Sequence, residues 1–172
     1  MPHTFPATLR AAGAALAAAL ALSGCTTLLR QPPPPGAPLT AVTAQLGQPN
    51  AVYPLPDGGQ RLDYGGQPMG QFQYMAHIGP DGRLVSFDQV LTSENFAKVQ
   101  VDRWTKADIL RHFGRPAEVS HVHVHNYEVW SYRYKEAGVW NSMMHVHFDE
   151  QGVVRQMLNG PDPMYDDRFL RR

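Results

Sequence analysis

The sequence is short of cysteine, of net charge and of catalytic motifs. Cys25 is its only cysteine, so no disulfide can form within the chain and its stability must come from packing. Lysine plus arginine and aspartate plus glutamate number 15 each, which leaves no excess positive charge to attract nucleic acid. The sequence contains no Gly-x-Ser-x-Gly, no His-Glu-x-x-His and no phosphate-binding glycine loop. We therefore predict that it is not an enzyme and does not bind nucleic acid.

Long hydrophobic runs are also absent, apart from one near the N-terminus. The apolar run at residues 11–22 is shorter than the roughly 20 residues that a membrane-spanning helix needs. A basic segment that ends at Arg10 precedes it, and the small pair Ser23-Gly24 follows it. These three parts are typical of an export signal, so we predict a signal peptide over residues 1–24.

The end of this segment resembles the bacterial lipobox, because Leu22-Ser23-Gly24 stands directly before Cys25. The resemblance implies cleavage before Cys25 and acyl chains on that residue; a plain signal peptide with a coincidental cysteine is the alternative. Several acyl chains anchor a protein stably, since each buried methylene contributes about 0.8 kcal/mol. Thr26 stands where an aspartate would favour retention in the inner membrane of many Gram-negative bacteria. The resemblance thus implies a lipid anchor in the outer membrane, with the folded part facing the periplasm.

The residues after Cys25 are rich in proline. Residues 30–38 read Arg-Gln-Pro-Pro-Pro-Pro-Gly-Ala-Pro, which excludes a helix interior and favours extended polyproline II. We therefore predict that residues 25–38 comprise the lipidated cysteine and a semi-rigid linker that holds the folded part away from the membrane.

Two stretches of the chain share one pattern, in which a short helix is followed by strands. Residues 39–49 and 105–116 each predict a helix that begins at a threonine cap and ends at Gly-x-Pro. After each helix the hydrophobic period changes from about 3.6 to about 2 residues, which indicates strands. The predicted strands cover residues 51–55, 60–64, 71–78 and 84–91 in the first copy and residues 118–125, 127–134, 142–148 and 153–158 in the second.

This pattern predicts an α+β fold. Two tandem units, at residues 39–91 and 92–160, each place a helix before an antiparallel meander. We expect the two meanders to share a continuous sheet with the helices on one face. Residues 93–101 predict a further helix that leads into the second unit, and the charged residues 161–172 predict a flexible tail.

Residues 39–160 resemble the SmpA/OmlA domain, which is also called BamE-like. The resemblance is carried by the helix from Thr105 to Pro116, by the Trp130-Ser131-Tyr132 strand and by the hairpin that begins at Phe148-Asp149. It implies a small outer-membrane lipoprotein of the β-barrel assembly machinery. The tandem arrangement is also similar to the β-lactamase inhibitor protein, in which two repeats join their sheets into one long concave surface.

Five histidines alternate with other residues along two predicted strands, which places each set on one face of its strand. They are His121, His123, His125, His145 and His147. If the intervening apolar residues face the helices, all five imidazoles lie on the opposite face of one sheet. Imidazole suits Zn, Cu or Ni, so the cluster is a candidate metal site for zinc or copper. The alternatives are a solvent-facing surface that tolerates histidine and a pH sensor.

Aromatic residues form the second candidate site. Trp130, Tyr132 and Tyr134 lie on the predicted strand at residues 127–134, and Trp140 lies in the loop that follows. Tyrosine and tryptophan are enriched at the centres of protein interfaces, which makes these four residues candidates for binding a protein partner. Core packing is the alternative for the strand residues, because strands favour aromatics as well. We expect Trp140 to be the better interface candidate, since loops on a rigid scaffold often carry function.

These observations predict a non-enzymatic protein that needs no cofactor, is held on the membrane by its N-terminal lipid and binds another envelope protein. The resemblance implies a role in outer-membrane protein assembly or envelope integrity, with an outer-membrane β-barrel or its assembly machinery as the partner. Two other functions stay open. One is a periplasmic lipoprotein that binds zinc or copper through the histidines, and the other is an inhibitor of a periplasmic enzyme.

Overall fold

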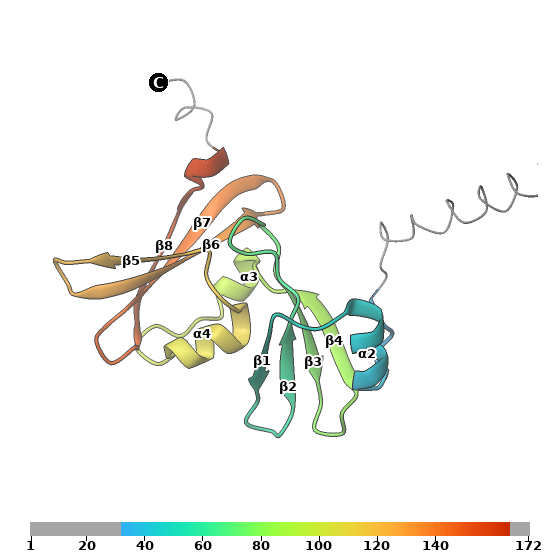
Figure 1. Cartoon of the computed structure of the whole chain (residues 1–172). Coiled ribbons are helices and arrows are strands. Elements are labelled where there is room, and N and C mark those ends of the chain that lie inside the picture. The colour runs from blue at the N-terminus through green and yellow to red at the C-terminus, as the bar shows by residue number, and fades with distance from the viewer. Residues whose placement is uncertain (1–31, 166–172) are drawn as a thin grey trace, which may run out of the picture. The chain divides into compact units, whose positions relative to one another are not determined.

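The structure is a computed structural model that describes residues 32–165 (Figure 1). These residues belong to one compact unit. The predicted signal peptide at residues 1–24, the lipidation site Cys25 and residues 166–172 of the predicted tail lie outside the described residues. None of the helices within residues 32–165 has the length and apolar character needed to cross a membrane.

The first half of the described chain forms a helix followed by a four-stranded antiparallel sheet. Helix α2 covers Leu39–Leu46. The strands are β1 (Ala51–Pro54), β2 (Gln60–Asp63), β3 (Tyr74–Ile78) and β4 (Leu84–Gln89), and they pair in that order. Gly58 and Gly82 adopt a positive φ in the turns β1–β2 and β3–β4, a conformation that favours glycine because it has no Cβ.

The second half forms two further helices and a second four-stranded antiparallel sheet. The helices are α3 (Ser93–Phe96) and α4 (Lys106–Phe113). The strands are β5 (Glu118–Val122), β6 (Tyr127–Glu136), β7 (Trp140–Phe148) and β8 (Val154–Pro161), which again pair in sequence order, and a short 3₁₀ helix, η3, follows at Pro163–Tyr165. The central pair, β6 and β7, is the longest, with 10 and 9 residues.

The predicted fold class, α+β units on one shared sheet, is wrong. The described residues form two separate four-stranded sheets instead of one continuous sheet. The helices are short, with 8 residues in α2, 4 in α3 and 8 in α4, so strands dominate the structure.

The last strand of each sheet is covered along part of its outer edge. Residues 36–39 run beside the start of β4, and residues 102–106 run beside the start of β8. The backbone hydrogen bonds that hold these two segments are between 2.7 and 2.9 Å long. Because those edge groups are already paired, no further strand can add to the sheet there.

Each sheet has its own hydrophobic core. On the first sheet, Val42 of α2 packs against Leu62, Ala76, Ile78 and Leu84. On the second sheet, the buried residues are Leu91, Phe96, Ile109, Phe113, Trp130, Tyr132, Tyr134, Val146, Phe148 and Val154. Phe96 of α3 and Phe113 of α4 stack with their ring centres 4.7 Å apart. The short helices therefore act as covers whose apolar sides complete the core of a sheet.

Helices α2 and α4 have different N-terminal caps but the same kind of C-terminal end. At α4, the Thr105 N–H donates to Asp108 Oδ2 at 2.8 Å and the Asp108 N–H donates to Thr105 Oγ1 at 3.4 Å, which is a capping box. Helix α2 has Pro38 at its N-cap position, and proline offers no capping side chain, so the predicted threonine cap of this helix is wrong. Both helices end at a glycine with positive φ, at Gly47 and Gly114, as the Gly-x-Pro pattern predicts.

Candidate functional site

Three of the four predicted partner-binding aromatics lie inside the protein. Trp130 is 9% exposed, Tyr132 0% and Tyr134 1%, so the prediction that these three contact a partner is wrong. They alternate along the central strand β6, on the face that α4 covers, and their polar atoms have internal partners. Tyr132 Oη, for example, donates to the carbonyl of Gly114 at 3.0 Å. Core packing therefore explains these residues.

Trp140, the fourth predicted residue, lies at the tip of the β6–β7 hairpin and is 68% exposed. Its neighbour Val139 is 65% exposed. We call these two residues the hairpin-tip surface. Single exposed apolar residues are common on proteins, but a tryptophan beside a valine at the end of a long hairpin presents a large apolar area to solvent.

The hairpin tip is held by a tight turn and by polar contacts at its base. Ala137 and Gly138 both adopt positive φ, and the Val139 N–H donates to the carbonyl of Glu136 at 3.0 Å. Asn141 Oδ1 accepts from Lys135 Nζ at 2.7 Å and from Gln71 Nε2 at 2.9 Å. The second of these bonds ties the hairpin to the loop between β2 and β3. The tip is therefore preorganised, which lowers the entropy that binding costs.

A shallow depression of about 300 Å³ lies near the same end of the hairpin, on the face that carries Trp140. Phe96, Met144 and Met157 line its apolar part, and Glu136 lies at the end closer to the turn. Glu136 is paired with Trp140 across the two strands, so both side chains point to this face. The depression extends the apolar area that a partner docked on the hairpin-tip surface could cover.

The five predicted metal-binding histidines do not share one face. His121 pairs with Glu128, whereas His145 pairs with Ser131, and positions 128 and 131 of β6 point to opposite faces. His121 therefore lies on the α4 side and His145 on the other. Strand β5 ends at Val122, so His123 and His125 lie in the turn that follows. The apolar residue Val124 is 86% exposed, so its side chain does not face a core.

The predicted metal site is therefore not formed. Within residues 32–165, no three side chains among His, Cys, Asp and Glu come together as metal ligands. His121 Nε2 lies 2.8 Å from Asn126 Oδ1, and His145 Nδ1 lies 2.7 Å from Ser131 Oγ. Burial lowers the pKa of His145 and of His147, which keeps both imidazoles neutral at pH 7. These histidines serve as polar residues of the sheet and its turn.

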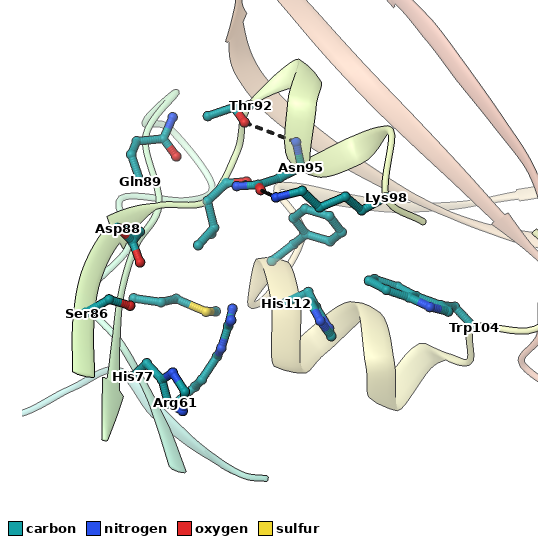
Figure 2. A pocket seen from close by; sticks show the side chains of 13 residues that line it. Arg61, His77, Ser86, Asp88, Gln89, Thr92, Asn95, Lys98, Trp104 and His112 are labelled. Carbon is teal, nitrogen blue, oxygen red and sulfur yellow. Dashed lines mark hydrogen bonds between the residues drawn. The ribbon is translucent and has the colours of Figure 1, made fainter. Parts of the chain in front are cut away.

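The sequence pattern does not predict a cleft of about 510 Å³ that lies between the first sheet and the helices α3 and α4 (Figure 2). Arg61 and His77 line it from strands β2 and β3. Trp104, two residues before α4, and His112, in the last turn of α4, line it from the other side, with their ring centres 4.2 Å apart. The alternation along β2 is the signal that could have indicated it, because Arg61 must face away from the buried Leu62.

Comparison with known proteins does not assign this chain to a family. No protein-family model matches the chain, and no curated protein sequence matches it. Among solved structures, it is similar to a DUF4309 family protein from Bacillus subtilis, with 13% identity, a TM-score of 0.32 and coverage of 72% of this chain and 77% of that one. It is also similar to a cysteine-rich secretory protein from Staphylococcus aureus, with 17% identity, a TM-score of 0.26 and coverage of 75% of this chain and 45% of that one. TM-scores this low carry no argument about fold or function, and the SmpA/OmlA resemblance stays a prediction.

Proposed function

We propose that this protein is a non-enzymatic lipoprotein of the outer membrane that faces the periplasm and binds another envelope protein through its hairpin-tip surface. Cys25 carries the lipid anchor, and the proline-rich residues 30–38 give the folded part its reach. The export signal and the lipobox resemblance support the location. The exposed Trp140 at the hairpin tip supports the proposal that the protein binds a partner there.

The exposed Trp140 on a preorganised hairpin is the observation that carries the binding proposal. Tryptophan is enriched among the residues that dominate binding energy, because its rigid apolar ring fills a pocket at a small entropic cost. Trp140 has Val139 beside it, and the depression lined in part by Met144 and Met157 lies on the same face of the hairpin, so one partner can contact both. The SmpA/OmlA resemblance supports an outer-membrane β-barrel, or a component of its assembly machinery, as this partner.

The binding proposal is tested by photo-crosslinking in the native envelope. A photoreactive amino acid at Trp140 of the full-length lipoprotein should capture a specific envelope protein, identified by mass spectrometry. Trp140→Ala should then weaken binding of that purified partner by about 30-fold or more, because a hot-spot residue contributes about 2 kcal/mol or more. The same substitution should change the free energy of unfolding by less than about 0.5 kcal/mol, since the side chain is exposed.

Val85 provides the matched control for crosslinking. It is 52% exposed on β4 of the first sheet, away from the hairpin. The photoreactive amino acid at Val85 should not capture the protein that Trp140 captures. Equal capture at both positions, or unchanged affinity of Trp140→Ala for the identified partner, would contradict the proposal.

The location is tested through the cysteine. Cys25→Ser should abolish the incorporation of labelled palmitate and remove the protein from the outer-membrane fraction, because no other thiol can receive the lipid. Thr26→Ala is the control and should keep both the label and the location. Thr26→Asp should keep the label but shift the protein to the inner membrane. A Cys25→Ser protein that still carries palmitate, or an unsubstituted protein that carries none, would refute the anchor.

A further inference from the structure

The register of the first sheet gathers polar side chains on one face. Arg61 of β2 pairs with His77 of β3, and His77 pairs with Ser86 of β4. Directly paired residues point to the same face, so these three side chains form a row across three strands. The apolar residues Leu62 and Ala76 point to the opposite face, where α2 covers them. The row of polar side chains therefore forms the floor of the cleft shown in Figure 2.

Two of these side chains have hydrogen-bonding capacity that other described residues do not use. Arg61 is half-buried and forms no ion pair with any residue in the described part of the chain. Burial lowers the pKa of its guanidinium, and Asp88 opposes that shift from a distance, so the group stays charged. His77 Nε2 is buried without a hydrogen-bond partner among residues 32–165. Buried polar atoms are nearly always paired with protein groups, ordered water or a ligand, so a molecule bound in the cleft can use these groups.

The charge of the cleft favours an anion. Arg61 and Lys98 are its cationic side chains, whereas Asp88 is its one carboxylate among the described lining residues. The two cations and one carboxylate give the lining a net formal charge of +1. Arginine binds carboxylates and phosphates particularly well, because its planar fork can donate two parallel hydrogen bonds.

The opposite wall offers apolar and aromatic contacts. Trp104 and His112 pack against each other there, and Phe113 of α4 adds an apolar contact. Burial lowers the pKa of His112, which favours the neutral ring in that position. Figure 2 shows Arg61 and His77 on the sheet side of the cleft, with His112 and Trp104 on the helical side. A volume of about 510 Å³ lies in the range typical of small-molecule sites.

We propose that this cleft binds a small molecule that carries a carboxylate or phosphate group on a planar or apolar body. Arg61 and His77 hold the oxyanion, while the body lies against Trp104 and His112. The cleft is formed by the first sheet with α3 and α4, and the hairpin-tip surface is formed by β6 and β7. This site is therefore independent of the proposed protein-binding surface and stands even if that proposal fails.

The proposal is tested by isothermal titration of the full-length lipoprotein in an uncharged maltoside detergent. Phenyl phosphate and phenylacetate are the anionic probes, and phenylacetamide is the neutral control of the same shape. At least one anionic probe should bind saturably and at least about tenfold more tightly than phenylacetamide, because charge-assisted bonds are the stronger ones. Binding of phenyl phosphate alone would identify a phosphate ester as the ligand class, and binding of phenylacetate alone would identify a carboxylate.

Variants locate the site. Arg61→Gln removes the charge but keeps most of the side-chain volume. It should lower the affinity of the protein for the anionic probe by at least about tenfold. Arg103→Gln is the matched control, because Arg103 is exposed and lies outside the cleft lining, and it should change the affinity less than about twofold. His77→Gln serves the same purpose if Arg61→Gln does not fold. Two results would overturn the proposal: no saturable binding of either anion, or equal affinity of the cleft variants and the unsubstituted protein.

Discussion

Replacing Arg133 with methionine should lower the free energy of unfolding by about 3–5 kcal/mol, because it leaves a buried carboxylate without its counter-charge. The Arg133 side chain is buried in β6 and pairs with the fully buried Asp162 and with the exposed Glu118. Its Nε also donates to the carbonyl of Pro68 at 3.2 Å. Without the guanidinium, the carboxylate of Asp162 is buried and has no cationic partner among residues 32–165.

Glu118→Gln is the control for Arg133→Met. Glu118 pairs with the same guanidinium but is exposed, so its loss should cost less than about 1 kcal/mol. The double variant Arg133→Met/Asp162→Leu should be more stable than Arg133→Met alone, since no unpaired charge remains buried. Urea denaturation of the full-length protein measures all three. If Arg133→Met lowers the free energy of unfolding by less than about 1 kcal/mol, the ion pair between Arg133 and Asp162 does not contribute to stability as expected.

Gly114→Ala should destabilise the protein by more than Gly47→Ala, although both glycines end a helix in nearly the same conformation. Gly114 has φ 73° and ψ −161°, and Gly47 has φ 87° and ψ −171°, a region that is essentially restricted to glycine. The backbone strain of about 1–3 kcal/mol is therefore common to both substitutions. The difference between them isolates the contacts of the added methyl group.

The surroundings of the two glycines differ. Nothing lies within 4 Å of a Cβ at Gly47. At Gly114, an added Cβ would overlap the Gln73 amide and lie 2.7 Å from Asp63 Oδ2. These two side chains are joined by a hydrogen bond, in which Gln73 Nε2 donates to Asp63 Oδ1 at 2.6 Å. Neither side chain can therefore move freely.

We expect Gly114→Ala to lose about 1–3 kcal/mol more than Gly47→Ala, which is the usual cost of overpacking. Urea denaturation of the two variants in parallel measures this difference. Circular dichroism of each variant before denaturation establishes that both still fold. Equal losses in the two variants would contradict the tight contact between the end of α4 and the first sheet.

The local elements of this protein follow from its sequence. Alternating strands, Gly-rich turns and the Gly-x-Pro stops are short-range signals, because each acts through the conformations open to a few adjacent residues. The strands β1 to β8 accordingly lie close to their predicted positions. Thr105 and Asp108 form the cap that a threonine three residues before a carboxylate indicates. The threonine cap at α2 failed because Pro38 already occupies the capping position.

The candidate site was only partly accessible to sequence reasoning. Trp140 is exposed, but it is the first residue of β7 and pairs with Glu136, whereas the sequence predicted that it lies in a loop. The histidines were misplaced because alternation says that residues share a face but not which face is buried. Packing of α4 against Trp130 and Phe148 decided that His121 lies on the helical side.

By itself, the sequence determined where strands and turns occur, that one cysteine follows a signal-like segment, and that one tryptophan stands at a hairpin tip. The tertiary structure alone decided that the two meanders form separate sheets, that Trp130, Tyr132 and Tyr134 are buried, and that Arg61 and His77 face a cleft. The features that the sequence determined depend on interactions between residues that are close together along the chain. The second set depends on strand register, on edge pairing and on which helix covers which face, and these contacts join residues that are far apart in sequence.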